Sequence, residues 1–170
     1  MKTLFASMLL SLFPFLGSAA EKIAVGDSIP AVICNDQDGK PVDLAKEGAK
    51  GYLLVYFYPK AKTGGCTKQG CSLRDSWADL QKAGVQVLGV STDDEKLQKE
   101  FKDEQKFPFR LLADKEKKAV TTAFGVKNLV GMASRSAFLF KDGKCVMADT
   151  KGHTTDQGQQ ILDFLKSEKK

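Results

Sequence analysis

Residues 51–59, GYLLVYFYP, contain seven consecutive apolar or aromatic residues and end at a proline. Such a run, without alternation of polar and apolar residues, is typical of a strand covered on both faces in the middle of a parallel sheet. Residues 85–91, VQVLGVS, form a second such run, and the segment between the two carries apolar residues at helical spacing. The order of strand, helix and strand therefore predicts a crossover unit with parallel strands in an α/β domain.

The rest of the chain offers further short elements, with no linker or repeat between them. Two Asp-Gly pairs, at 38–39 and 142–143, are typical turns of β-hairpins. We expect hairpins over 31–44 and 135–148 and a strand over 109–113. Helices are expected over 66–83, from 93 or 94 onward, and over 117–124. A last helix should be capped by Thr154 or Thr155 and should bury Ile161, Leu162 and Leu165. The chain is thus expected to form one mixed α/β domain.

Residues 1–20 have the parts of a secretory signal: a basic residue near the start, an apolar run over 4–16 and small residues up to Ala20. The apolar run is too short and wrongly flanked for a membrane-spanning helix. We expect cleavage after Ala20, which leaves residues 21–170 as a secreted or periplasmic domain without stable membrane association. An uncleaved membrane anchor is the alternative.

The formal charge of +5 comes from 26 basic and 21 acidic residues, and the basic residues are scattered among the acidic ones. Only Arg74, Arg110 and Arg135 could supply the forked guanidinium that favours base recognition, so we expect no nucleic-acid partner. The four cysteines are too few for a disulfide-built scaffold, and they lack the paired C-x-x-C spacing of a structural zinc site. We therefore expect no metal.

Cys66 follows a Gly-rich turn, PKAKTGGC, at the start of a predicted helix. Such a turn exposes backbone N–H groups and the positive end of the helix dipole, which suit an anion. A free thiol has a pKa of about 8.5, and helix N-termini and nearby cations lower it. Thr63 adds a hydroxyl, and Gly64 and Gly65 allow close approach to the sulfur. The segment predicts a reactive thiolate, with a buried structural cysteine as the alternative.

Cys71 lies five residues after Cys66. In an ideal helix this spacing separates the Cα atoms by roughly 8.6 Å, beyond the roughly 7 Å limit for a disulfide. A bond between the two thiols therefore requires the first helical turns to unwind, and Gly70 lowers helix propensity by about 1 kcal/mol relative to Ala. We predict a redox reaction coupled to local unfolding; two unrelated cysteines are the alternative.

Arg135 and His153 are the two other polar candidates. Arg135 opens an apolar strand, RSAFLF, where a cation usually needs a partner, so it is a candidate charge partner for the thiolate. Its alternative is an edge residue that reaches water. His153 stands beside a Gly-Thr-Thr run with no evident orienting partner, so we expect a surface loop residue rather than the base of a Cys-His hydrolase.

Pro59, Thr63 and Cys66 match the P-x-x-x-T-x-x-C signature of the peroxiredoxins. The stretch YFYPKAKTGGCTKQGCSLRD closely resembles the bacterioferritin-comigratory (peroxiredoxin Q) branch, which has a second cysteine five residues on. The resemblance runs from about residue 25 to residue 163 and includes the R-x-x-F strand that begins at Arg135. It implies a thioredoxin-like fold, with a central mixed β-sheet flanked by helices, and a thiol peroxidase.

By this resemblance, Cys66 is the peroxidatic cysteine, which becomes a sulfenic acid, and Cys71 resolves it as an intramolecular disulfide. The implied substrates are hydrogen peroxide and organic hydroperoxides, and a thioredoxin-like donor re-reduces the disulfide. The implied substrate contacts and pocket shielding come from Gly65, Thr63, Arg135 and Pro59. The scheme needs no metal, flavin or other cofactor. We expect a monomer, because both thiols lie in one chain, and an exported donor, because the signal separates the protein from intracellular reductants.

The sequence departs from the branch at Gly64, where a proline is usual, and has Gln69 where many other peroxiredoxins carry Glu. Cys34 and Cys145 lie outside the family pattern and are expected to be buried or inert, with a bridge between them as the alternative. Two competing functions stay open at this point. A thiol-disulfide oxidoreductase on the same fold would usually carry C-x-x-C, and a non-catalytic binding module would not need the matched motif.

Overall fold

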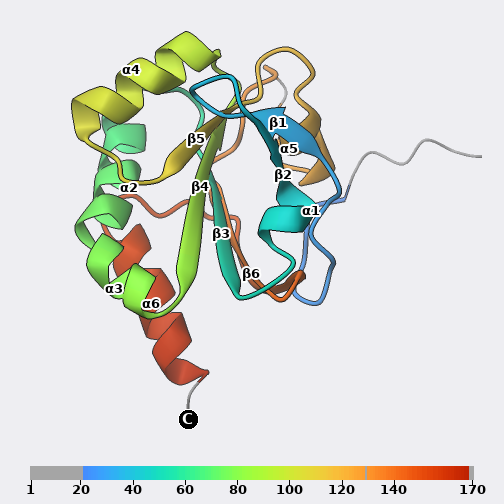
Figure 1. The fold of residues 1–170 in the computed structure, drawn as a ribbon, viewed down its shortest axis with the longest axis vertical. Coiled ribbons are helices and arrows are strands. Elements are labelled where there is room, and N and C mark those ends of the chain that lie inside the picture. The colour runs from blue at the N-terminus through green and yellow to red at the C-terminus, as the bar shows by residue number, and fades with distance from the viewer. Residues whose placement is uncertain (1–20, 129, 169–170) are drawn as a thin grey trace, which may run out of the picture.

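The computed structural model describes residues 21–128 and 130–168 (Figure 1). The expected signal at 1–20 lies outside these residues. Within them, five strands form one sheet in the order β5-β4-β3-β6-β7. Neighbours β3, β4 and β5 are parallel, whereas β6 is antiparallel to β3 and to β7. The bounds are β3 Tyr52–Phe57, β4 Val85–Ser91, β5 Arg110–Ala113, β6 Ser136–Lys141 and β7 Lys144–Asp149.

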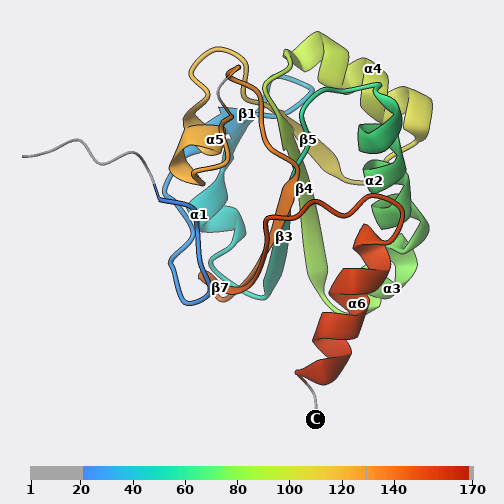
Figure 2. The same cartoon turned by 180° about the vertical axis from the view of Figure 1, so that it is seen from behind.

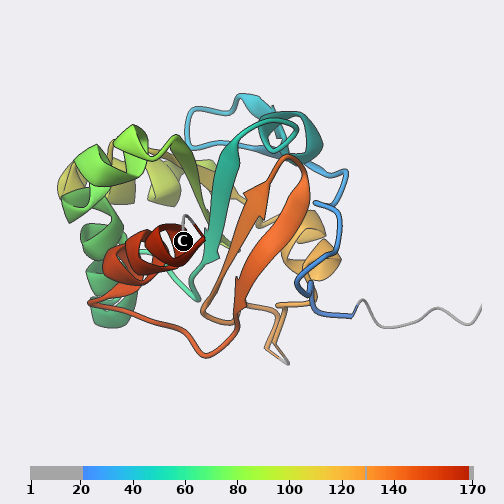
Figure 3. The same cartoon turned by 90° about the horizontal axis from the view of Figure 1, so that it is seen from below.

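The central strand β3 is apolar throughout because both of its faces are covered. Leu53, Val55 and Phe57 belong to one buried cluster, and Leu54 and Tyr56 to another on the opposite face. Figures 2 and 3 show the two covering layers on either side of the sheet. One consists of the hairpin β1 (Ile33–Asn35) and β2 (Pro41–Asp43) with α1 (Leu44–Glu47) and α5 (Ala119–Ala123); the other consists of α2 (Gly64–Asp75), α3 (Trp77–Lys82), α4 (Glu95–Gln105) and α6 (Gln157–Ser167). This confirms the predicted mixed sheet flanked by helices.

The predicted helix over 66–83 is wrong in its continuity, because it is divided into α2 and α3 at Ser76. The amino end of α6 packs against this break. A Cβ on Gly158 would overlap the Ser76 hydroxyl and the Ser72 carbonyl, so the two helices approach closely only because residue 158 is a glycine. The apolar residues at helical spacing that were expected to form the buried side of this segment include Cys66, Leu73 and Leu80, and all three are buried.

The predicted cap of the last helix by Thr154 or Thr155 is also wrong. Helix α6 begins at Gln157, after Asp156, which makes no side-chain cap bond. Instead, the Ser72 hydroxyl of α2 accepts a hydrogen bond from the Gly158 N–H at 3.0 Å. A free N–H group of the first turn is thus satisfied by another helix, and sequence-local capping rules do not anticipate this. Ile161 and Leu165 are buried as expected, and Leu162 is half-buried.

Helix α5 is shorter than the predicted 117–124 segment, because the residue that binds its first N–H groups lies just after strand β5. Asp114 follows β5 directly, and its carboxylate accepts hydrogen bonds from the N–H groups of Val120 and Thr121 at 3.2 and 2.8 Å. Lys118, just before α5, has a φ of 48°, outside the helical region. Among the described residues, no helix is both long and apolar enough to cross a membrane.

Candidate functional site

Cys66 occupies the first turn of α2, where the chain leaves the central strand β3. The helix begins at Gly64, with Thr63 in an extended conformation before it. The Cys66 side chain is 1% exposed, so its sulfur faces the apolar cluster between α2 and the sheet. The first N–H groups of a helix have no intrahelical acceptors and carry the positive end of its dipole. This position stabilises negative charge on the sulfur.

Arg135 provides the cation at this site. Strand β6 pairs with β3 so that Ser136 lies opposite Phe57, and this register places Arg135 beside the carboxyl end of β3. Its Nη2 lies 3.4 Å from Cys66 Sγ as a donor. The predicted pairing of the guanidinium with the thiol is therefore present, and it depends on the antiparallel register of two central strands.

Two further acceptors on α2 fix the direction of the guanidinium. Arg135 Nη1 donates to Gln69 Oε1 at 2.8 Å and to the Gly65 carbonyl at 3.2 Å. A Cβ on Gly65 would lie 3.0 Å from Arg135 Nη2, so this glycine allows the close approach of the cation. Gly64 differs, because apart from its chain neighbours and the adjacent helix backbone no atom lies within 4 Å of the position that its Cβ would take.

Gln69 and Gln157 extend this network away from the sulfur. Both side chains are fully buried, and Gln69 Nε2 donates to Gln157 Oε1 at 3.0 Å. Gln69 therefore links the guanidinium of Arg135 to the first residue of α6. The sequence marked Gln69 only by its position in a family pattern, and nothing local marked Gln157, because the contact joins residues 88 positions apart.

Thr63 and Pro59 lie on the loop that leads into α2. The Thr63 hydroxyl donates to the Lys60 carbonyl at 3.0 Å, and its side chain does not cap the helix. Both lone pairs of this hydroxyl remain available to accept a hydrogen bond. Pro59 directly follows the buried Tyr58 and is itself half-buried. The matched signature residues thus lie on one short loop at the end of β3.

Cys71 lies on the same helix as Cys66 and is half-buried. Both thiols are free, and α2 is continuous between them. The Cys71 sulfur lies 3.6 Å from Gln105 Oε1 at the end of α4. In the folded helix the two cysteines therefore face different partners, as expected from their spacing.

Cys34 and Cys145 are both buried and free, so the alternative of a bridge between them is not realised in this structure. Burial raises the pKa of Cys34 to about 12 and the pKa of Cys145 to about 11. Each sulfur contacts a nearby backbone carbonyl, of Asn35 and Met147 respectively. This agrees with the expectation of buried, inert thiols.

We expect Cys34 and Cys145 to resist alkylation in the folded protein at pH 8. Because their pKa values lie at about 12 and 11, both are almost fully protonated there, and the thiolate is the reactive form. Iodoacetamide labelling followed by peptide mass spectrometry is expected to be at least about 100-fold slower at these sites than in the urea-unfolded chain. Labelling of either residue at the unfolded rate would contradict the assignment.

The expectation that His153 has no orienting partner is wrong. His153 Nδ1 lies 2.9 Å from Asp156 Oδ2, and Nε2 lies 4.0 Å from Asp149 Oδ2. The pairing arises because Asp156, at the start of α6, is three residues from the histidine. The side-chain partner of the Cys66 sulfur is Arg135, so the histidine and aspartate do not form a catalytic unit with this thiol.

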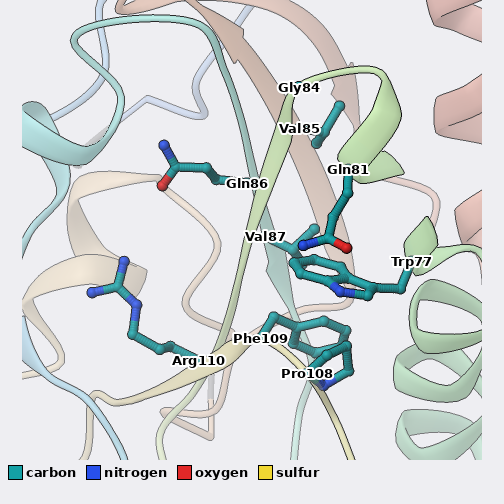
Figure 4. Close-up of a pocket in the computed structure, with 9 residues that line it drawn as sticks. All are labelled: Trp77, Gln81, Gly84, Val85, Gln86, Val87, Pro108, Phe109 and Arg110. Atoms are coloured by element: carbon teal, nitrogen blue, oxygen red, sulfur yellow. The ribbon is translucent and has the colours of Figure 1, made fainter. Parts of the chain in front are cut away.

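A surface pocket between α3 and the sheet edge lies away from these residues. Figure 4 shows the Trp77 ring beside Phe109, with Gln81 above them and Arg110 on the far side of β4. Val85 and Val87 line the pocket from the amino end of β4, whereas Cys66 follows the carboxyl end of β3. Since β3 and β4 are parallel, the pocket and the thiol lie toward opposite ends of the sheet. Among the described residues, no group of three or more His, Cys, Asp or Glu side chains could hold a metal ion.

Known proteins with similar sequences and folds fit this geometry. Residues 25–148 match the AhpC/TSA family. The chain is 40% identical over 134 residues to peroxiredoxin bcp1 of Schizosaccharomyces pombe (78% of this chain, 69% of that protein) and 39% identical over 153 residues to peroxiredoxin Bcp of Escherichia coli (85% and 96%). It spans about half the length of the chloroplastic relatives it matches. The solved structure of the Xanthomonas campestris bacterioferritin comigratory protein superposes with a TM-score of 0.74 at 31% identity, over 85% of this chain and all of that one.

Proposed function

The chain belongs to the AhpC/TSA family, as a peroxiredoxin of the Bcp/PrxQ branch, and we propose on this basis that Cys66 is its peroxidatic cysteine. The protein is a thiol-dependent peroxidase of this type. The contact between Cys66 Sγ and Arg135 Nη2 at the first turn of α2 carries the residue assignment. It combines a nucleophilic sulfur with a fixed cation in a buried position.

In the first step, the Cys66 thiolate attacks one oxygen of a hydroperoxide, and the O–O bond breaks. The products are a Cys66 sulfenic acid and, after protonation of the leaving oxygen, an alcohol or water. Arg135 holds the thiolate and stabilises the oxygen on which negative charge develops. Gly65 leaves room for the guanidinium, Thr63 accepts a hydrogen bond from the peroxide O–H, and Pro59 shields the pocket. Both hydrogen peroxide and alkyl hydroperoxides are substrates; the Xanthomonas relative is described as having alkyl peroxide reduction activity.

In the second step, Cys71 attacks the sulfenic sulfur, which forms a Cys66–Cys71 disulfide and releases water. This step requires the turns of α2 between the two cysteines to unwind, because the folded helix holds them apart. A dithiol donor of the thioredoxin type then reduces the disulfide by exchange. Since both thiols lie in one chain, a monomer suffices for turnover.

We propose that the protein acts outside the cytosol, because residues 1–20 have the basic start, apolar run and small residues that are typical of a secretory signal. The mature protein would comprise residues 21–170 and be secreted or periplasmic, with an exported donor. Fractionation of the native host with an antibody to the mature domain tests this, and an uncleaved chain in the cytosol would contradict it.

The assignment of Cys66 is tested with the reduced Cys71→Ser variant. One equivalent of hydrogen peroxide, added in the presence of dimedone, is expected to give a stable adduct on the Cys66 peptide by mass spectrometry, because no resolving thiol competes for the sulfenic acid. Cys34 and Cys145 serve as internal controls and are expected to stay unmodified. An adduct on another cysteine, or none, would contradict the assignment.

A further inference from the structure

The carboxyl half of α4 runs beside α2 and the loop that leads into it (Figures 1 and 2). Before the helix begins, Lys62 makes ion pairs of 2.8 and 2.7 Å with Glu100 and Glu104. These acceptors are about half exposed, so each pair contributes little to holding the loop. The contacts further along α2 are more buried, and they coincide with the turns that must unwind.

Gln105, the last residue of α4, contacts α2 through both its side chain and its backbone. Its side-chain Oε1 lies 3.6 Å from the Cys71 sulfur, and its carbonyl accepts a hydrogen bond from Arg74 Nη1 at 2.8 Å. Arg74 lies in the last turn of α2, three residues beyond Cys71. One residue of α4 therefore holds both the resolving thiol and the turn that follows it.

Phe107 completes this contact two residues later. Its ring lies directly over Gly70, where a Cβ would overlap it, and the phenylalanine is 3% exposed. The ring is also fixed from behind, stacked on Phe109 at a centroid distance of 5.2 Å. Gly70, which directly precedes Cys71, is thus a weak helix former held against a rigid neighbour. The contacts of Gln105 and Phe107 with α2 therefore favour the folded helix and oppose the movement that brings Cys71 to Cys66.

We propose that Gln105 is a positioning residue that holds Cys71 in the folded helix and thereby sets how the Cys66 sulfenic acid is partitioned between two fates. The inference rests on the proposed function, in which Cys66 is oxidised and Cys71 resolves it. In one fate, the Cys71 thiol attacks the sulfenic sulfur to give a disulfide and water. In the other, a second hydroperoxide oxidises the sulfenic acid to a sulfinic acid and is itself reduced to an alcohol or water. Holding Cys71 in place slows disulfide formation. The sulfenic acid then lasts longer and has more time to react with a second hydroperoxide.

The side chain of Gln105 can be tested without disrupting the core, since it is half-buried and its backbone contact to Arg74 does not depend on it. In Gln105→Ala, the Cys71 thiol loses its acceptor. We expect disulfide formation to become about threefold faster, at the lower end of the range for one hydrogen bond because a thiol is a weak donor. The sulfinic fraction per turnover, measured by intact mass at high peroxide, should fall by the same factor. The rate of the first oxidation should stay unchanged.

Gln105→Glu and Lys99→Ala are the matched controls. The glutamate retains an acceptor oxygen near Cys71, so its disulfide rate should not exceed that of the wild type, which separates the contact from general loosening. Lys99 also joins α4 to a distant segment, by an ion pair of 2.7 Å with Asp38, but it has no contact with Cys71. Its variant should partition like the wild type.

Quenched-flow mass spectrometry of disulfide and sulfinic acid distinguishes the outcomes. An unchanged partition in Gln105→Ala, or an equal acceleration in Lys99→Ala, would overturn the inference while leaving the proposed function intact. If the wild-type protein forms no Cys66–Cys71 disulfide at all, the proposed function itself fails. A faster disulfide in Gln105→Ala with wild-type behaviour in both controls supports the positioning role.

Discussion

Replacing Cys66 with serine is expected to lower the rate of peroxide consumption on the order of 10⁴-fold or more, as removal of a catalytic nucleophile does in other enzymes. Serine is similar in size to cysteine and fits the 1% exposed position in the first turn of α2, so the fold should be retained. Its hydroxyl is not ionised at neutral pH and cannot replace a thiolate as the nucleophile. Initial rates of hydrogen peroxide loss, with dithiothreitol as reductant, measure the effect.

The same substitution at Cys34 and at Cys145 provides the matched controls. Both residues are buried like Cys66, but neither has a guanidinium at its sulfur, and their thiols are protonated at neutral pH because burial raises each pKa. We expect Cys34→Ser and Cys145→Ser to keep peroxidase rates within about twofold of the wild type, provided that they fold. A Cys66→Ser protein as active as the wild type would rule out the proposed nucleophile.

Arg135→Ala is expected to lower the second-order rate constant for peroxide by about 10² to 10³, the usual cost of removing a preorganised donor to developing charge. The variant loses the donor 3.4 Å from the Cys66 sulfur and the two bonds to Gly65 and Gln69 that orient it. Stopped-flow fluorescence of Trp77, the one tryptophan in the sequence, provides the measurement, because this residue begins α3 just after the break that ends α2.

Two variants separate charge from geometry in this prediction. Arg135→Lys keeps the charge but cannot donate in the same fork to both Gln69 and the sulfur, so an intermediate loss of about tenfold is expected. Arg110→Ala removes an arginine that pairs with Glu47 near the edge strand β5, and it should leave the rate constant unchanged. Equal rate constants for Arg135→Ala and the wild type would show that the cation does not act on the sulfur.

Much of this site could be predicted from the sequence because its main signals are local. The unbroken apolar run of β3 required cover on both faces, and the Gly-rich turn after it predicted a helix start at Cys66, two residues after the actual start at Gly64. Arg135 was recognisable as a cation at the entrance of an apolar strand. In each case a single segment carried the information, since burial and helix initiation depend on neighbouring residues.

The features that the sequence did not reveal depend on contacts between distant segments. The break at Ser76 and the start of α6 at Gln157 arise where Gly158 packs against α2 and donates to Ser72. The link from Gln69 to Gln157 joins the same two helices. These residues are polar, apart from Gly158, and widely separated along the chain, so neither periodicity nor propensity distinguishes them from surface positions.

The acceptors that orient Arg135 all belong to the first two turns of α2. These are also the turns that must come apart when the two cysteines join. The oxidised protein would therefore lose the arrangement of Arg135 and α2 that binds the peroxide. A further peroxide molecule would find no competent site until a donor had reduced the disulfide and the helix had re-formed. Turnover would then follow a ping-pong scheme, in which the peroxide binds only to the folded, reduced protein and the donor only to the unwound, oxidised one.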